Sequence, residues 1–250
     1  ESDMSDGMVS ALIVLEDVRV GDVVRLSYTI KGINPVLKGM DHDDVYFSWV
    51  DPILHRHVSA LYDPGTVIMH RSFNGAPDVT IKKQNDAVLV FAEAKQIPAL
   101  REEGDYPRWY RPFPSVMFAP QRSWAEVVRW AKPLYPDPGA LPKELEAKMQ
   151  EWKAIANPEQ RLMAVLQTMQ EEIRYFGIEM GESSHRPAPP AETWTRRFGD
   201  CKDKAYLMSV VLSRLGIPAV PALATTRHGK GVRDFVPAAT AFNHVIVQAQ

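Results

Sequence analysis

The sequence has 250 residues, of which 45% are hydrophobic and 24% are charged, as in folded globular proteins with one large or two ordinary domains. Its formal net charge of −2 gives no electrostatic reason to expect binding to nucleic acid or to an anionic membrane surface. No stretch approaches the ~20 consecutive apolar residues that a membrane-spanning helix needs, so we expect no transmembrane segment in this sequence.

Apolar and polar residues alternate in much of the first 95 positions, a pattern that predicts half-buried strands. Residues 24–30 predict one strand and residues 8–16 its partner, with a turn near Gly21. The dipeptide Asn74-Gly75 predicts a two-residue hairpin turn, because both residues tolerate positive φ. We therefore expect an antiparallel β-sandwich-like domain or a strongly curved sheet, whose further strands cover 45–50, 57–62, 66–73, 79–82 and 87–94.

Residues 97–120 are rich in proline and aromatic side chains, a composition that excludes helix and disfavours strand. We expect an ordered connector that lies over the surface of one or both domains. Its aromatic side chains either pack against the sheet or line a ligand groove.

Helices are predicted after this connector. Ser123 and Glu126 form a capping-box pattern at the start of the first helix, and the prolines of 133–139 end it. A second helix carries Leu145 at the centre of its apolar stripe, and Asn157 before a proline begins a third.

The last 50 residues predict a helix followed by antiparallel strands. Gly199-Asp200 begins the helix and Gly216 ends it, and strands are expected at 217–225 and 242–247, with a hairpin or loop between them. The sequence thus predicts an α+β protein with a β-rich accessory domain over residues 1–120 and a second domain over 121–250.

Cys201 is the only cysteine, and it lies in the first turn of that predicted helix. The positive end of the helix dipole favours a thiolate there, and so a nucleophile. A lone cysteine is also often a small buried apolar residue. His244, which leads into the last predicted strand, is the candidate general base, and its alternative is a hydrogen-bonded structural histidine.

Residues 194–247 resemble the core of the transglutaminase-like superfamily of papain-like thiol enzymes. The similarity lies in Gly199-Asp200-Cys201-Lys202-Asp203-Lys204-Ala205, in Leu215-Gly216-Ile217 and in Phe242-Asn243-His244. Residues 172–190 also fit the bacterial branch of this superfamily. The first ~120 residues resemble a β-rich domain of unknown function that precedes this core in bacterial cell-envelope proteins, a weaker similarity carried by residues 20–28 and 114–130.

The resemblance implies acyl transfer on amide or peptide bonds through a thioester on Cys201, with His244 as general base. Water as acceptor gives amidase or peptidase activity, and an amine gives transglutaminase-type crosslinking. The backbone N–H of Cys201 is an oxyanion donor, and the side chains of Tyr175 and Trp194 are candidate second donors, although both also suit structural roles.

Such sites use a third residue, usually aspartate, on the strand after the histidine. The sequence has no acidic residue after His244, and neither Asp203 nor Asp234 lies where this residue belongs. We therefore expect the third residue beyond Gln250, in a chain truncated at its C-terminus. Asp203 is expected to pair with a local base, and Lys202 and Lys204 to be solvated or to bridge to the preceding loop.

No cofactor is expected. His55 and His57 share a strand face, but no third metal ligand is identifiable, so we expect no metal. The implied substrate is a peptide or protein amide. Because the sequence begins with Glu1, we expect a fragment or a leaderless mature form, and the resemblance implies a periplasmic or secreted protein.

Two alternatives stay open. The chain could be a catalytically degenerate binding or scaffolding module with a cell-envelope partner. The N-terminal domain could also cover Cys201 until a partner or cleavage moves it.

Overall fold

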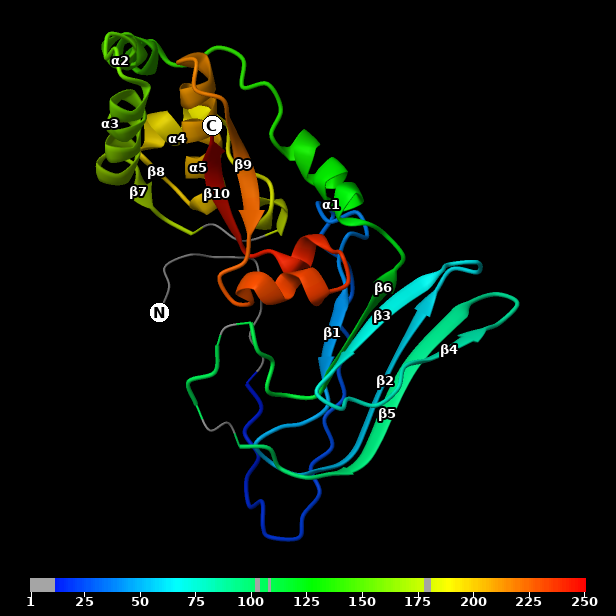
Figure 1. The fold of residues 1–250 in the computed structure, drawn as a ribbon. Coiled ribbons are helices and arrows are strands. Elements are labelled where there is room, and N and C mark those ends of the chain that lie inside the picture. The colour runs from blue at the N-terminus through cyan, green and yellow to red at the C-terminus, as the bar shows by residue number, and fades with distance from the viewer. Residues whose placement is uncertain (1–11, 102–103, 108, 178–180) are drawn as a thin grey trace.

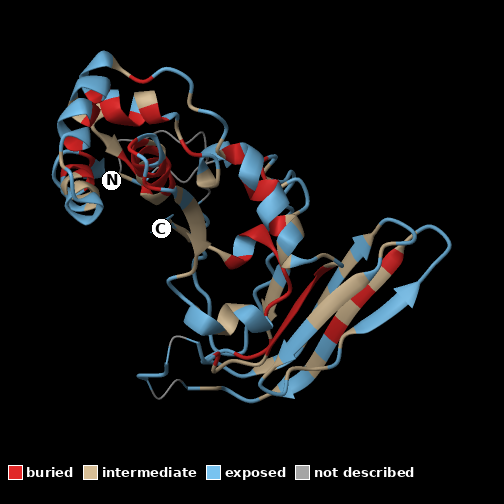
Figure 2. Ribbon diagram, turned by 45° about the horizontal axis from the view of Figure 1, so that its top comes forward, coloured by how far each residue is buried: buried red, intermediate tan, exposed pale blue. Residues whose placement is uncertain are grey.

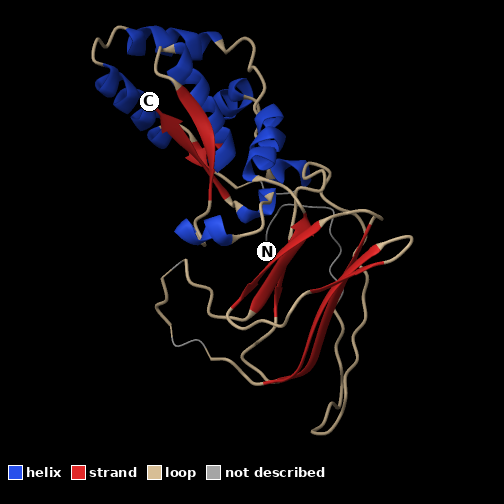
Figure 3. Ribbon diagram, turned by 45° about the vertical axis from the view of Figure 1, so that its right-hand side comes forward, coloured by secondary structure: helices blue, strands red, loops and turns tan. Residues whose placement is uncertain are grey.

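The protein is described here from a computed structural model, which describes residues 12–101, 104–107, 109–177 and 181–250. Its strands and helices separate into two parts that lie against each other, with most strands in one part and all α-helices in the other (Figures 1 and 3). The strands of the first part are β1 (Asp43–Tyr46), β2 (Ile53–Tyr62), β3 (Ile68–Phe73), β4 (Thr80–Lys83), β5 (Val88–Ile97) and β6 (Ser115–Pro120).

These strands form two antiparallel sheets of three strands each, in the orders β1-β6-β3 and β2-β5-β4. Side chains from both sheets share one hydrophobic core, in which Val116 and Phe118 of β6 meet Val88 and Val90 of β5. Buried residues are concentrated in β5, β6 and the helix α5 (Figure 2). The predicted mixture of α and β structure with antiparallel sheets is confirmed.

The strand β6 corrects the expectation that residues 97–120 disfavour a strand and form a connector over the surface. It is the central strand of its sheet, and its residues from Val116 to Ala119 are almost fully buried. The prolines lie only at its ends, Pro114 before it and Pro120 as its last residue, where a missing N–H costs least. Four consecutive apolar residues between those prolines were the signal for a strand buried on both faces.

The predicted strands at the N-terminus are a second correction. Residues 8–11 lie outside the described residues, and the described stretch 12–42 holds no strand. The turn is present, since the N–H of Asp22 donates to the carbonyl of Arg19 at 3.0 Å and Gly21 has a φ of +99°. Apolar side chains on both sides of the turn, such as Leu12 and Ile30, are exposed. An alternating pattern forms a strand only where a second strand is available to share its backbone hydrogen bonds.

Asn74 and Gly75 adopt the expected positive φ values of 50° and 69°. They do not join a hairpin, because β3 pairs with β6 while the following strand β4 pairs with β5. The turn prediction is therefore confirmed and the pairing prediction is wrong.

The helical part begins where the caps predict. Ser123 and Glu126 form a capping box at α1, and Asn157 accepts hydrogen bonds from the N–H groups of Glu159 and Gln160 at the start of α3. The elements up to Gly199 are α1 (Trp124–Ala131), the 3-10 helix η1 (Lys132–Leu134), α2 (Lys143–Lys153), α3 (Pro158–Glu171), β7 (Arg174–Tyr175), the 3-10 helix η2 (Gly181–Ser184), α4 (Pro190–Arg196) and β8 (Phe198–Gly199).

The central element of this part is α5 (Cys201–Arg214), which ends before Gly216 with a φ of +82°. It packs against the antiparallel strands β9 (Ala219–Ala224) and β10 (His244–Ala249) and against α3 and α4. The 3-10 helices η3 (Gly229–Asp234) and η4 (Ala239–Ala241) connect the two strands. A core of side chains from α2, α3, α4 and α5 holds the helices together.

The two parts share buried contacts. The indole Nε1 of Trp130 on α1 donates to the carbonyl of Val36 at 2.8 Å. Met117 of β6 packs with Phe235 and Val236, which follow η3. None of the described helices is long and apolar enough to cross a membrane.

Candidate active site

The start of α5 is fixed by a reciprocal cap. The carboxylate of Asp200 accepts hydrogen bonds from the N–H groups of Lys202 and Asp203, and the carboxylate of Asp203 accepts one from the N–H of Asp200 at 3.3 Å. A Cβ at position 199 would lie 2.7 Å from the Cβ of Asp203, so only glycine allows this close turn. The cap makes Cys201 the first residue of the helix.

The charged groups beside Cys201 are paired and buried. Asp203 binds the Arg196 guanidinium at 2.6 Å and accepts the N–H of Ala188 at 2.8 Å, which confirms the predicted local base partner. The ammonium of Lys202 pairs with Asp200, and that of Lys204 donates to the carbonyl of Ile173. Lys202 is only 3% exposed, so the expectation of a solvated side chain is wrong for it. Charges this deep need partners to offset their desolvation.

The structure brings Cys201 and His244 to one cavity. The strand β10 lies beside the start of α5, and both residues line a cavity of about 200 Å³ on one side of the strand. They also line a second cavity of about 470 Å³. No hydrogen bond joins the thiol to the imidazole in the described part of the chain, and such contacts are often loose before substrate binds.

The thiol of Cys201 is half-buried, and this burial raises its pKa above the ordinary value. The backbone N–H of Val245, which points at the sulfur, lowers the pKa, as do the ammonium and the N–H of Lys202. The charge of Asp200 raises it. The expectation that the helix start favours the thiolate is therefore wrong, because the effect of desolvation on the pKa is larger than the opposite effect of the hydrogen-bond donors.

Tyr135 is a site residue that the sequence did not reveal. It follows η1, lines the smaller cavity with Cys201, and has a buried hydroxyl without a hydrogen-bond partner among the described residues. Burial raises its pKa, as does the negative charge of Asp200, so the hydroxyl stays a neutral donor. The proline-rich stretch around it indicated only the end of a helix.

The two predicted oxyanion donors differ in position. Tyr175 lines the larger cavity with Cys201 and His244, and it is 54% exposed. Trp194 is 2% exposed in the helical core, with the Arg197 guanidinium 3.9 Å from its ring centre, and it lines neither cavity.

A second imidazole, that of His185, also lines the smaller cavity, where its Nδ1 lies 2.8 Å from the Ser184 hydroxyl. His185 lies in a loop whose glycine, serine and proline content indicated a loop but gave no sign of a site residue. His55 and His57 both contact Glu93, and no group of three potential ligands that would suit a metal ion is found within the described ranges.

Comparison with known protein families identifies a domain at the N-terminus of the chain. Residues 1–101 match the family model of a domain of unknown function with a solved structure, DUF3857. This match supports the predicted presence of a domain of unknown function before the Cys201 region. No curated protein matches the sequence.

Among solved structures, a "putative protease" from Parabacteroides distasonis superimposes with a TM-score of 0.67 at 14% identity, over 82% of this chain and 40% of that one. The two proteins share a fold over this region, and the present chain spans less than half the length of that relative. The periplasmic domain of TgpA from Pseudomonas aeruginosa gives a TM-score of 0.33 at 17% identity, over 81% of this chain and 67% of that one, too low to establish a shared fold.

Proposed function

We propose that this chain carries out thiol-dependent acyl transfer on amide or peptide bonds, with Cys201 as nucleophile and His244 as general base. The observation that carries the proposal is the shared cavity. The only thiol of the chain lies at the first position of a helix with a reciprocal cap, and the histidine of the adjacent strand lines the same space. The resemblance of residues 194–247 to transglutaminase-like thiol enzymes supports the same assignment.

The raised pKa of Cys201 defines the first step, because the thiol is protonated at neutral pH. His244 accepts this proton while the sulfur bonds to the amide carbonyl carbon. When the tetrahedral intermediate breaks down, the carbon–nitrogen bond breaks and the imidazolium gives its proton to the departing amine. Water or a second amine then attacks the thioester, with His244 again as base, and the thiol is released.

Two groups can stabilise the oxyanion of the intermediate. The backbone N–H of Cys201, at the first position of α5, has no partner within the helix. The buried hydroxyl of Tyr135 on the same cavity is the second donor, and its lack of a partner keeps it available. Tyr175 is the donor for a substrate bound in the larger cavity.

The proposal includes three further parts. An aspartate beyond Gln250 orients the imidazole of His244. Residues 1–120, which hold β1 to β6, form an accessory domain ahead of a catalytic domain over 121–250. The protein acts in the periplasm or outside the cell, a location taken from the resemblance to bacterial cell-envelope proteins.

Acyl-enzyme trapping tests this function. The protein is mixed with glutamine-containing peptides, quenched in acid and analysed by mass spectrometry, with and without a primary amine as acceptor. We expect an adduct on Cys201 and a deamidated or amine-linked product. Equal turnover by Cys201→Ala and the wild-type protein would contradict the assignment.

One observation favours a second candidate, a non-catalytic module that binds a cell-envelope partner. The thiol is half-buried and its pKa is raised rather than lowered, as in structural cysteines. A folded protein that forms no acyl-enzyme with any of these peptides would favour this candidate.

A further inference from the structure

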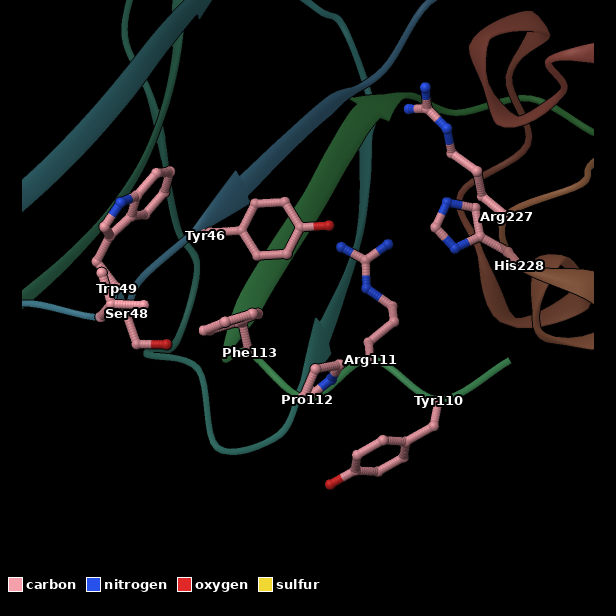
Figure 4. A pocket seen from close by; sticks show the side chains of 10 residues that line it. Tyr46, Ser48, Trp49, Tyr110, Arg111, Pro112, Phe113, Arg227 and His228 are labelled. Carbon is pink, nitrogen blue, oxygen red and sulfur yellow. The ribbon is translucent and has the colours of Figure 1, made fainter. Parts of the chain in front are cut away.

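A cavity of about 400 Å³ lies between the strand part and the segment that follows β9, separate from the cavities that Cys201 lines (Figure 4). Four of the ten residues that line it are aromatic: Tyr46 at the end of β1, Trp49 just after it, and Tyr110 and Phe113 in the connector before β6. Arg227 and His228 reach it from the other part of the molecule. Its volume suits a small apolar or aromatic group.

One wall of this cavity holds a buried cation. Arg111 is 7% exposed, and its Nη2 donates to Asp44 at 2.6 Å and to Ser115 at 2.9 Å. The guanidinium lies 4.9 to 5.2 Å from the ring centres of Tyr46, Phe73 and Phe235, and Figure 4 shows it between the Tyr46 ring and His228. Its Nε and Nη1 are buried and find no acceptor among the described residues.

A second buried donor lines the same cavity. Ser48 is 3% exposed, and its hydroxyl has no partner in the described part of the chain. A buried donor without an acceptor loses its hydrogen bond to water and gains none in return, and the cost is larger when the donor is charged. Two side chains with unpaired donors on one cavity require an explanation. A ligand that supplies the missing acceptor would be such an explanation.

The charges around the cavity indicate which sign of charge a ligand would carry. Asp44 offsets the charge of Arg111, but Arg227 is exposed and no ion pair to it is found among the described residues. None of the ten residues that line the cavity is acidic. The cavity therefore has an excess of positive charge beside aromatic surface.

The cavity shares lining residues with a neighbouring cavity, and that one shares a residue with the smaller Cys201 cavity. Tyr46, Arg227 and His228 line an adjoining cavity of about 460 Å³, which Asn243 also lines. Asn243 in turn lines the smaller cavity of Cys201 and His244.

We propose that the cavity beside Arg111 binds a carboxylate next to an aromatic or branched apolar group, as in the last residue of a peptide or a free acid of that kind. Arg111 and Arg227 supply the charge, Ser48 supplies a hydroxyl donor, and Trp49 and Phe113 pack against the apolar group. This binding does not depend on chemistry at Cys201.

Titration calorimetry with N-acetylphenylalanine and its uncharged amide tests the proposal. We expect the acid to bind at least about tenfold more tightly, since a lost charge-assisted hydrogen bond costs 1.4 kcal/mol or more. Equal affinity for the two, or no saturable binding of the acid, would overturn it. The peptide Ala-Ala-Phe distinguishes the source: tighter binding than N-acetylphenylalanine identifies a peptide end, and weaker binding identifies a small free acid.

Variants locate the site. Arg227→Gln should weaken binding of the acid about three- to tenfold, whereas Arg233→Gln, on the same exposed segment but away from the cavity, should not. Ser48→Ala should weaken binding without lowering the melting temperature, because it removes a buried hydroxyl that has no partner. Equal losses in the two arginine variants would contradict the assignment. Cys201→Ala should bind the acid like the wild-type protein, which separates this site from the proposed catalysis.

Discussion

The cavity at Cys201 and the cavity at Arg111 differ in how fully the charged side chains around them are paired. Around Cys201, Lys202 pairs with Asp200, Arg196 pairs with Asp203, and Lys204 donates to a backbone carbonyl. Beside the second cavity, Arg111 and Ser48 keep donors without acceptors, and Arg227 adds a charge with no ion pair described. The first arrangement suits a reaction at an uncharged amide, and the second suits binding of an anion. The following predictions test this contrast.

The largest expected effect is that of Cys201→Ala, which should abolish acyl transfer because no other thiol exists in the chain. The measurement is amine release from peptide amides together with acyl-enzyme trapping. Binding of N-acetylphenylalanine should be unchanged in the same variant. If both properties were lost, the two cavities would not be separate sites.

His244→Gln should reduce the rate of acyl transfer by about 10²- to 10⁴-fold, the usual contribution of a general base. His185→Gln is the matched control, because this second imidazole lines the same cavity and pairs with Ser184. Single-turnover rates distinguish the two variants. A larger loss in His185→Gln would assign the base to the loop before α4.

Asp203→Ala should lower the free energy of unfolding by about 3 kcal/mol, since it leaves the partly buried Arg196 with only the exposed Glu192 as counter-ion and removes part of the helix cap. Urea unfolding measures this. Glu182→Ala is the control: it breaks the exposed pair with Arg186, and it should cost under about 1 kcal/mol. Similar losses of unfolding free energy in both variants would show that the ion pair of Asp203 stabilises the fold no more than an exposed pair does.

Tyr135→Phe should slow acyl transfer by about 10²-fold, the effect of losing one oxyanion donor. The unfolding free energy should stay equal or rise, because the hydroxyl is buried without a partner. Rate and unfolding measurements on one preparation separate the two effects. An unchanged rate would remove Tyr135 from the proposed mechanism.

The smallest effect concerns the pH dependence of iodoacetamide labelling. Because burial raises the pKa of Cys201, less thiolate is present at each pH than in the unfolded chain. We expect the native labelling rate to rise with pH through a midpoint above that of the urea-unfolded protein. A midpoint below it would mean that the donors from Val245 and Lys202 outweigh burial.

The sequence predicted those features whose partners lie within a few residues. The caps at Ser123, Asn157 and Asp200 are examples, because side chain and backbone N–H are at most three positions apart. The strands expected at 8–16 and 24–30 failed, since a strand depends on a distant partner and on burial. The same limit hid β6, because one of its faces packs against the opposite sheet and the other against residues 235–241, more than a hundred positions away.

For the site, the residue pattern indicated the thiol, the helix start that presents it and the strand that carries His244. The fold was needed to show how burial shifts the pKa of the thiol and that Tyr135, but not Trp194, lines its cavity. It was also needed to bring Arg111 and Ser48 to a second cavity. The two kinds of feature differ in the sequence distance between the groups that interact. Capping and helix geometry are local, whereas desolvation and unpaired donors depend on which distant segments exclude water from a group.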